Sequence, residues 1–187
     1  MSKNYLNLAL KLEYFTILWN ILEGILAVSV GIFSGSVSLV AYGLESNIEV
    51  FASSVVVWDL KGIKRTDKAL RAIGFAYLLA SFYIFFDATK NLISKNHANP
   101  TLFGIILMFI AAIGMITLGL SKRSVGKKMQ SSSVLADAKF TLIDACLSTS
   151  VLVGLLCNAL FSFWWMDQAI ALLLAGVAFR EGLREIF

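Results

Sequence analysis

The chain is poor in the residues that build disulfide frameworks, thiolate metal clusters or soluble domains. Its 187 residues include two cysteines, one proline and one histidine, and only 15% are charged, against about a quarter in a typical soluble domain. Cys146 and Cys157 share one apolar run, a position that indicates neither a disulfide framework nor a thiolate cluster. The sequence also has no nucleophile–base constellation and no phosphate-binding loop. We therefore expect no enzyme and no bound cofactor.

Apolar residues dominate what is there, at 58% of the chain. A membrane-spanning helix needs roughly 20 apolar residues, and runs this long span lipid only as helices, because helices satisfy their own backbone hydrogen bonds. We predict an all-α integral membrane protein, with residues 1–187 forming a single six-helix transmembrane domain and no sizeable soluble domain. The predicted spans are 12–33, 37–59, 70–92, 101–120, 134–158 and 164–180.

Two connections between spans have distinct patterns. Asn99-Pro100-Thr101 indicates the start of the fourth helix, with proline in its first turn. Ser121 to Ser133 is rich in lysine and serine, and we interpret it as a flexible connection.

Lysine and arginine positions give the orientation of the spans. The net charge of +4 arises from residues between spans, so it does not indicate nucleic-acid binding. With both termini in the cytoplasm, 13 basic residues lie inside and two flank an outer loop, as the positive-inside rule requires. We expect the protein in the inner (plasma) membrane of a bacterium. The inner residues are Lys3, Lys11, Lys61, Lys64, Arg65, Lys68, Arg71, Lys122, Arg123, Lys127, Lys128, Arg180 and Arg184, and the outer ones are Lys90 and Lys95.

Four acidic residues lie in the middle of predicted spans: Glu23, Glu45, Glu49 and Asp144. A carboxylate at membrane depth costs a few kcal/mol or more, so it persists where it faces a partner, a cavity or an ion. Because all four fall near the midpoints of their spans, they predict an ion site at the membrane midplane. The alternative for each is a neutral, hydrogen-bonded packing residue.

Spacing supports a shared site. Glu45 and Glu49 are four residues apart and therefore lie on one helical face, where two like charges at depth need a cation or protons to neutralise them. Asp144 is on a stripe with Asp137, which lies about 10 Å nearer the cytoplasm. We expect Asp137 either to meet entering ions or to be solvated, and Glu23 to be a ligand or to support one.

Other polar residues are interpreted as incidental. The single histidine, His97, is in an outer loop and is expected to be solvated. Acids at helix ends or in loops are expected to have no role in the site; they are Asp59, Asp67, Asp87 and Asp167.

Three motifs together resemble one transporter family. Residues 34–49 contain Ser-Gly-Ser followed by Glu45 and Glu49. Residues 136–144 contain Asp137 and end at Asp144, and residues 164–172 and 180–185 complete the pattern. In order and spacing these motifs resemble the cation diffusion facilitators, and the resemblance covers essentially the whole chain.

The resemblance implies a six-helix homodimer that moves divalent metal ions outward against protons. It implies a four-ligand site at Glu45, Glu49, position 140 and Asp144, but Phe140 stands where the family commonly has histidine. It also implies a cytoplasmic C-terminal domain, which we do not expect here, so the chain resembles a short form. Glu23 is then the candidate replacement ligand.

Metal choice follows from the lost histidine. Carboxylate sites suit harder ions such as manganese, whereas histidine suits zinc. Zinc, manganese and iron all stay candidate substrates. The competing hypothesis is a membrane protein that does not transport, with a degenerate site and a role in binding or assembly.

Overall fold

The computed structural model describes residues 3–62 and 67–186, and every regular element in these ranges is a helix. This confirms the all-α prediction. Lys64 and Arg65 lie outside the described residues, as do the side chains of Lys3 and Lys68. The helices are α1 (Lys3–Ser34), α2 (Val37–Leu60), α3 (Asp67–Ile93), α4 (Leu102–Met129), α5 (Ser132–Phe161) and α6 (Trp165–Ile186).

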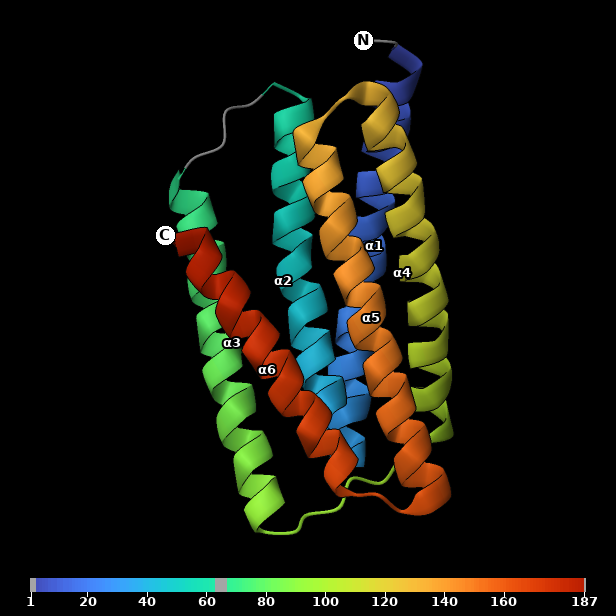
Figure 1. Ribbon diagram of the computed structural model, residues 1–187, viewed down its shortest axis with the longest axis vertical. Coiled ribbons are helices and arrows are strands. Elements are labelled where there is room, and N and C mark those ends of the chain that lie inside the picture. The colour runs from blue at the N-terminus through green and yellow to red at the C-terminus, as the bar shows by residue number, and fades with distance from the viewer. Residues whose placement is uncertain (1–2, 63–66, 187) are drawn as a thin grey trace.

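The helices form two groups (Figure 1). One group is a four-helix bundle, in which α1 packs on α2 and α4, and α5 packs on α4 and α2. The other is the pair α3 and α6, which contacts the bundle through α2 and α5. One apolar core joins all six helices through residues such as Ala27, Leu39, Ile84, Met108, Val151 and Leu174.

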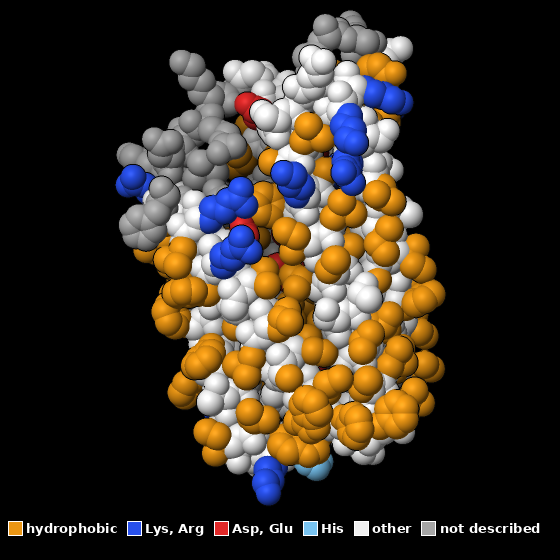
Figure 2. All heavy atoms as spheres, viewed as in Figure 1, with side chains coloured by type: hydrophobic (Ala, Val, Ile, Leu, Met, Phe, Trp, Pro, Cys, Tyr) orange, Lys and Arg blue, Asp and Glu red, His pale blue; other side chains and the backbone are white. Residues whose placement is uncertain are grey.

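The chain runs up and down, so its connections alternate between two ends. The N-terminus, the α4–α5 turn and the last turn of α6 lie toward one end, here called the basic end (Figure 1). The α1–α2, α3–α4 and α5–α6 connections lie at the opposite end. The name reflects the basic side chains that gather there on the face drawn in Figure 2.

Helix boundaries correct two expectations. Ser121 to Ser133 is not a flexible connection, because α4 continues to Met129 and α5 begins at Ser132. Lysines favour helix, and Lys127 and Lys128 complement the negative C-terminal end of α4. Pro100 precedes the fourth helix rather than lying in its first turn, where Thr101 is the N-cap and accepts a hydrogen bond from the Gly104 amide at 3.1 Å.

The lateral surface is apolar. Large side chains such as Phe33, Leu79 and Phe86 are 91%, 71% and 73% exposed, and apolar atoms cover the middle of the face in Figure 2. A surface of this kind is unusual in a soluble monomer. By length and composition, three of the described helical segments can cross a membrane: Asn4–Ser34, Leu102–Met129 and Ser132–Phe161. The six-span topology therefore stays a prediction.

Glycine allows α1 and α2 to approach closely. A Cβ atom at Gly43 would lie 2.7 Å from the backbone oxygen of Gly24 and 2.8 Å from the backbone nitrogen of Val28. Backbone atoms cannot move aside as a side chain can, so any larger residue must push the two helices apart. Because α1 and α2 both carry site residues, this contact also sets the geometry of the site.

We predict that Gly43→Ala lowers the stability of the protein by roughly 2 kcal/mol, the cost of overpacking, or about 4–8 °C in Tm. Gly176→Ala is the matched control, because a Cβ atom at Gly176 would meet nothing within 4 Å. Thermal unfolding of the two detergent-solubilised variants, followed by tryptophan fluorescence, measures both. Equal melting temperatures would show that α1 and α2 tolerate separation.

Candidate functional site

A carboxylate from α6 fixes the start of α2. Ser36 is the N-cap of α2, and Asp167 accepts hydrogen bonds from the hydroxyls of Ser36 and Ser38, both at 2.5 Å, and from the Val37 amide at 2.8 Å. The expectation that Asp167 is incidental is wrong, since its side chain is 1% exposed. The negative charge suits the positive end of the helix. This contact joins the two helix groups at the opposite end and fixes where α2 begins.

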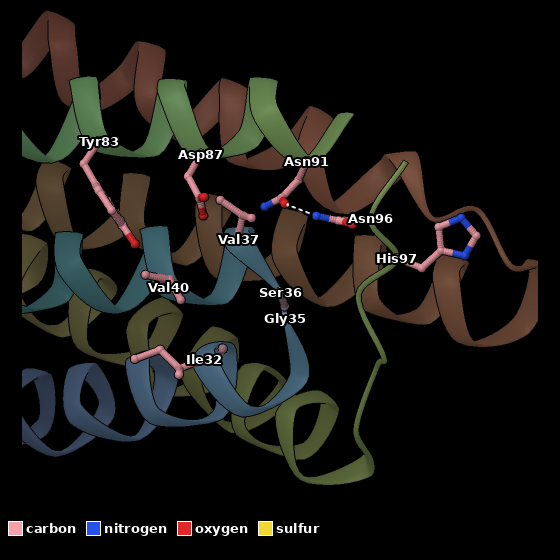
Figure 3. A pocket seen from close by; sticks show the side chains of 11 residues that line it. Ile32, Gly35, Ser36, Val37, Val40, Tyr83, Asp87, Asn91, Asn96 and His97 are labelled. Atoms are coloured by element: carbon pink, nitrogen blue, oxygen red, sulfur yellow. Dashed lines mark hydrogen bonds between the residues drawn. The ribbon is translucent and has the colours of Figure 1, made fainter. Parts of the chain in front are cut away.

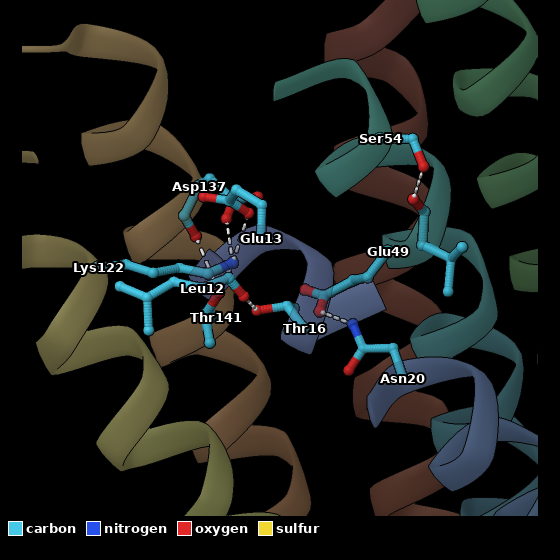
Figure 4. A network of polar contacts seen from close by, with 10 residues as sticks. Leu12, Glu13, Thr16, Asn20, Glu49, Ser54, Lys122, Asp137 and Thr141 are labelled. Carbon is cyan, nitrogen blue, oxygen red and sulfur yellow. Dashed lines mark hydrogen bonds and ion pairs between the residues drawn. The ribbon is translucent and has the colours of Figure 1, made fainter. Parts of the chain in front are cut away.

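Glu45 and Glu49 follow along the buried face of α2. Both side chains are buried, one helical turn apart. Oε2 of Glu49 accepts a hydrogen bond from Nδ2 of Asn20 on α1 at 3.1 Å (Figure 4). Oε2 of Glu45 has no hydrogen-bond partner among the described residues. These two neighbouring carboxylates therefore have few hydrogen-bond donors around them, and their charge must be neutralised by protons or a cation.

Tyr42 connects the acids of α1 and α5. Its hydroxyl donates a hydrogen bond to Oε1 of Glu23 and lies 3.5 Å from Oδ2 of Asp144. A hydroxyl has one proton to donate, so the two carboxylates cannot both be satisfied by it. Oε2 of Glu23 and Oδ1 of Asp144 have no partner among the described residues. The structure therefore brings Glu23 and Asp144 to one tyrosine.

A buried ion-pair network lies nearer the basic end. Lys122 on α4 contacts Asp137 of α5, and its Nζ lies 3.0 Å from Oε2 of Glu13 on α1 and 3.3 Å from Oγ1 of Thr141 (Figure 4). Lys122 and Glu13 are fully buried, and Asp137 is 4% exposed. The solvated alternative for Asp137 is thus wrong. Lys122, expected to serve only the topology, is instead a buried cation.

Sequence reasoning missed the residues of α1 that complete the site. Its buried positions include Glu13, Thr16 and Asn20 in addition to the predicted Glu23. Their spacing of three or four residues is that of one helical face. A polar stripe at this period in an otherwise apolar helix is the sequence signal that points to them.

Position 140 faces a positive charge. The guanidinium of Arg184 on α6 lies over the ring of Phe140, 5.6 Å from its centroid, a cation–π distance. Arg184 also lies 3.6 Å from Oε2 of Glu181. The ring thus occupies the place where the family resemblance expects a ligand, and a cation of the protein covers it.

A separate cavity of about 360 Å³ opens at the opposite end (Figure 3). Asp87 of α3 lines it, and Asn96 donates a hydrogen bond to Asn91 at its rim at 2.9 Å. His97 also lines it, is exposed as expected, and stacks on Trp164 with ring centroids 5.1 Å apart. Asp87 is thus a cavity residue, which the sequence did not indicate.

The buried acids supply oxygen ligands, but their side chains do not converge on one coordination site. Among the described residues, no three histidine, cysteine or acidic side chains are close enough together to hold a metal ion. The free cysteines lie elsewhere, Cys146 on an exposed face of α5. Carboxylate, phenol and amide oxygens suit hard divalent cations.

Comparison with known proteins identifies relatives. Residues 69–187 match the model of the cation efflux transmembrane domain. An uncharacterized transporter of Methanocaldococcus jannaschii is 30% identical over 190 residues, which are 91% of this chain and 66% of that protein. The magnetosome protein MamB of a Magnetospira strain is 24% identical over 67% of this chain and 47% of its own length. Transmembrane protein 163 of Xenopus laevis is 20% identical over 98% of this chain and 68% of its own length. The chain thus spans between about half and two thirds of these relatives.

We predict that Asp167→Ala destabilises the protein, because the hydroxyls and amides at the start of α2 lose a charged acceptor while they stay buried. Losing such a partner costs about 2 kcal/mol, or roughly 4–8 °C in Tm. The matched control is Asp59→Ala, which removes an exposed aspartate from the other end of α2. A melting temperature as high as that of the control would contradict the role assigned to Asp167.

Proposed function

This chain belongs to the cation efflux family, and on that premise we propose that it carries a divalent metal cation across a membrane in exchange for protons. The proposed ligands are Glu45, Glu49 and Asp144, with Glu23 as a further ligand. One observation supports this most directly. Carboxylate oxygens of Glu23, Glu45 and Asp144 are buried in an apolar bundle without hydrogen-bond partners among the described residues, so they need a cation or protons.

Charge balance gives the coupling. Ionised Glu45, Glu49 and Asp144 sum to −3, so one divalent cation leaves a net charge of −1. When the cation leaves, the carboxylates repel one another at close range in an apolar setting, which favours proton uptake. Protons and the metal ion thus compete for the same oxygens. The same competition makes exchange possible without a histidine at position 140.

Glu23 is proposed to act through Tyr42. The tyrosine hydroxyl bonds Glu23 and lies close to Asp144, so a rotation of one side chain can exchange the phenol for a cation. Glu23 then supplies the oxygen that position 140 does not. All donors in this set are oxygen atoms, which favours manganese over zinc relative to a site with histidine.

In the proposed topology the chain crosses the membrane six times, with both termini in the cytoplasm of a bacterial cell. The proposed transporter is a homodimer. The distribution of Lys and Arg along the sequence supports this orientation. The apolar lateral surface supports immersion of the whole bundle in lipid. The basic end then faces the cytoplasm, and Asp137 lies between that end and the proposed site.

A second function is supported by Arg184. Its guanidinium lies over Phe140, close to where a fourth ligand is expected, and a fixed positive charge there opposes metal binding. This favours a membrane protein that has a degenerate site and acts in binding or assembly. Transport is preferred, because a protein without an ion to bind gains nothing from several unpartnered buried carboxylates, each of which costs stability.

Metal flux into proteoliposomes under an imposed pH gradient tests the proposal. We predict that Glu49→Gln and Asp144→Asn each lower metal affinity at least about tenfold, which is roughly 1.4 kcal/mol, and reduce flux in proportion. Asp59→Asn, an exposed aspartate of α2, is the matched control and should behave as the wild type. Manganese, iron and zinc are compared in separate assays.

The outcomes separate the two functions. Flux by the wild type that depends on Glu49 and Asp144 supports transport. Metal binding without flux supports the binding or assembly role. Unchanged affinity in both variants would remove these carboxylates from the site.

Position 140 gives a further prediction. Phe140→His adds an imidazole one turn from Asp144 and should raise the preference for zinc over manganese about tenfold or more, because nitrogen ligands suit zinc. Phe140→Leu controls for loss of the ring under Arg184. Competition binding of the two metals at fixed pH measures the ratio. An equal ratio in both variants would mean that position 140 does not face the ion.

A further inference from the structure

Lys122 occupies a position that resembles a small cation site. Its ammonium contacts carboxylate oxygens of Asp137 and Glu13 and the hydroxyl oxygen of Thr141. These three oxygens come from α1 and α5, whereas the lysine comes from α4. An ammonium has three donors and no acceptor; it donates hydrogen bonds to Asp137 and Thr141, whereas its contact with Glu13 is an ion pair without a hydrogen bond. Figure 4 shows the lysine side chain reaching from α4 to these oxygens.

The ammonium does not balance the charge around it. Two ionised carboxylates and one ammonium sum to −1, and all three side chains are buried. Neither carboxylate oxygen of Glu13 has a hydrogen-bond partner among the described residues, although the side chain is fully buried. A divalent cation would balance both carboxylates. The arrangement thus has both the charge and a free oxygen for such an ion.

The distances fit exchange of one cation for another. Nζ lies 3.0 Å from Glu13 and 3.3 Å from Thr141, whereas hard divalent cations bind oxygen at about 2.0–2.6 Å. Contraction of these contacts by up to about 1.3 Å requires rotation of the side chains of Glu13, Asp137 and Thr141 between rotamers. Two carboxylates, one hydroxyl and water are a common ligand set for manganese or magnesium.

This network and the deeper carboxylates lie in series. Glu13 precedes Glu23 by ten residues on α1, and Asp137 precedes Asp144 by seven on α5, or about 15 Å and 10 Å along the helices. Thr16 and Asn20 lie between them on the buried face of α1. A cation that moves from the basic end toward the deeper carboxylates meets the network first.

We propose that Glu13, Asp137 and Thr141 form a second cation site, and that the ammonium of Lys122 occupies it as a tethered cation. A mobile divalent cation is thereby kept from resting there, and the deeper carboxylates become the place where it binds. Lys122 is a positioning residue in this scheme, because its ammonium determines at which set of carboxylates the divalent cation binds. The inference rests on the proposed function only for the direction of ion movement.

The test removes the tether in a protein whose deeper carboxylates are neutral. Starting from the Glu49→Gln/Asp144→Asn double variant, Lys122→Met is added and Mn²⁺ binding is measured by electron paramagnetic resonance of the free ion. The expected result is a gain of about one Mn²⁺ per chain, with affinity raised at least about tenfold. Adding Glu13→Gln should abolish the gain. Arg123→Met is the matched control, since it removes an exposed positive charge beside Lys122.

Loss of one partner of a buried ion pair is strongly destabilising, so a second measurement is needed if the Lys122→Met variant folds poorly. The melting temperature as a function of Mn²⁺ concentration tests the proposal in that case. A cation that takes the place of the ammonium binds only the folded state and should raise Tm as its concentration increases. The Lys122→Met protein should therefore melt higher in millimolar Mn²⁺, and the Arg123→Met protein should not.

Two outcomes would overturn the proposal. One is a Lys122→Met protein that stays folded and gains no Mn²⁺, which would make Lys122 an ordinary ion-pair partner. The other is a protein that millimolar Mn²⁺ fails to restore. Neither outcome depends on metal flux, so a failure here and a failure of the transport assay are distinguishable.

Discussion

A carboxylate inside an apolar helical bundle must be compensated by a hydrogen-bond donor, a cation or a proton, because packed side chains do not solvate its charge. In this protein two buried acids are compensated by donors or by a cation, and three others are not. Asp167 is satisfied by hydroxyls and amides at the start of α2. Asp137 is paired with Lys122. Glu45, Glu23 and Asp144 retain unpartnered oxygens, and the proposed function follows from these.

The compensated acids support the uncompensated ones. Asp167 ties α6 to the first residues of α2, so the position of Glu45 and Glu49 depends on a contact at the far end of their helix. The close approach at Gly43 and Gly24 holds α1 against α2, which brings Asn20 to Glu49. The arrangement of the central carboxylates thus depends on contacts made elsewhere along α1 and α2.

Much of the fold was accessible from the sequence, and the site was accessible in part. Long apolar runs predict helices, and each of the six predicted spans coincides with a helix, although α1 begins earlier and α4 ends later than its span. Glu45 and Glu49 are buried on one face, as their spacing predicts. Helix periodicity describes one helix at a time, however, so it did not reveal that Glu13 and Lys122 meet across α1 and α4. The lysine-rich and serine-rich composition after residue 121 also led to the prediction of a flexible connection, although lysine favours helix.

Composition and spacing along the chain account for the helices, for the position of the four acids inside them and for the resemblance to the family. Tertiary structure decided which of the polar residues are paired. Asp167 and Asp87 look alike in sequence, yet one is enclosed by α2 and the other lines a cavity. Lys122 looks like a residue of the cytoplasmic flank, yet it is buried between two carboxylates. Compensation of a charge depends on partners brought close in space, and only packing of the helices supplies them.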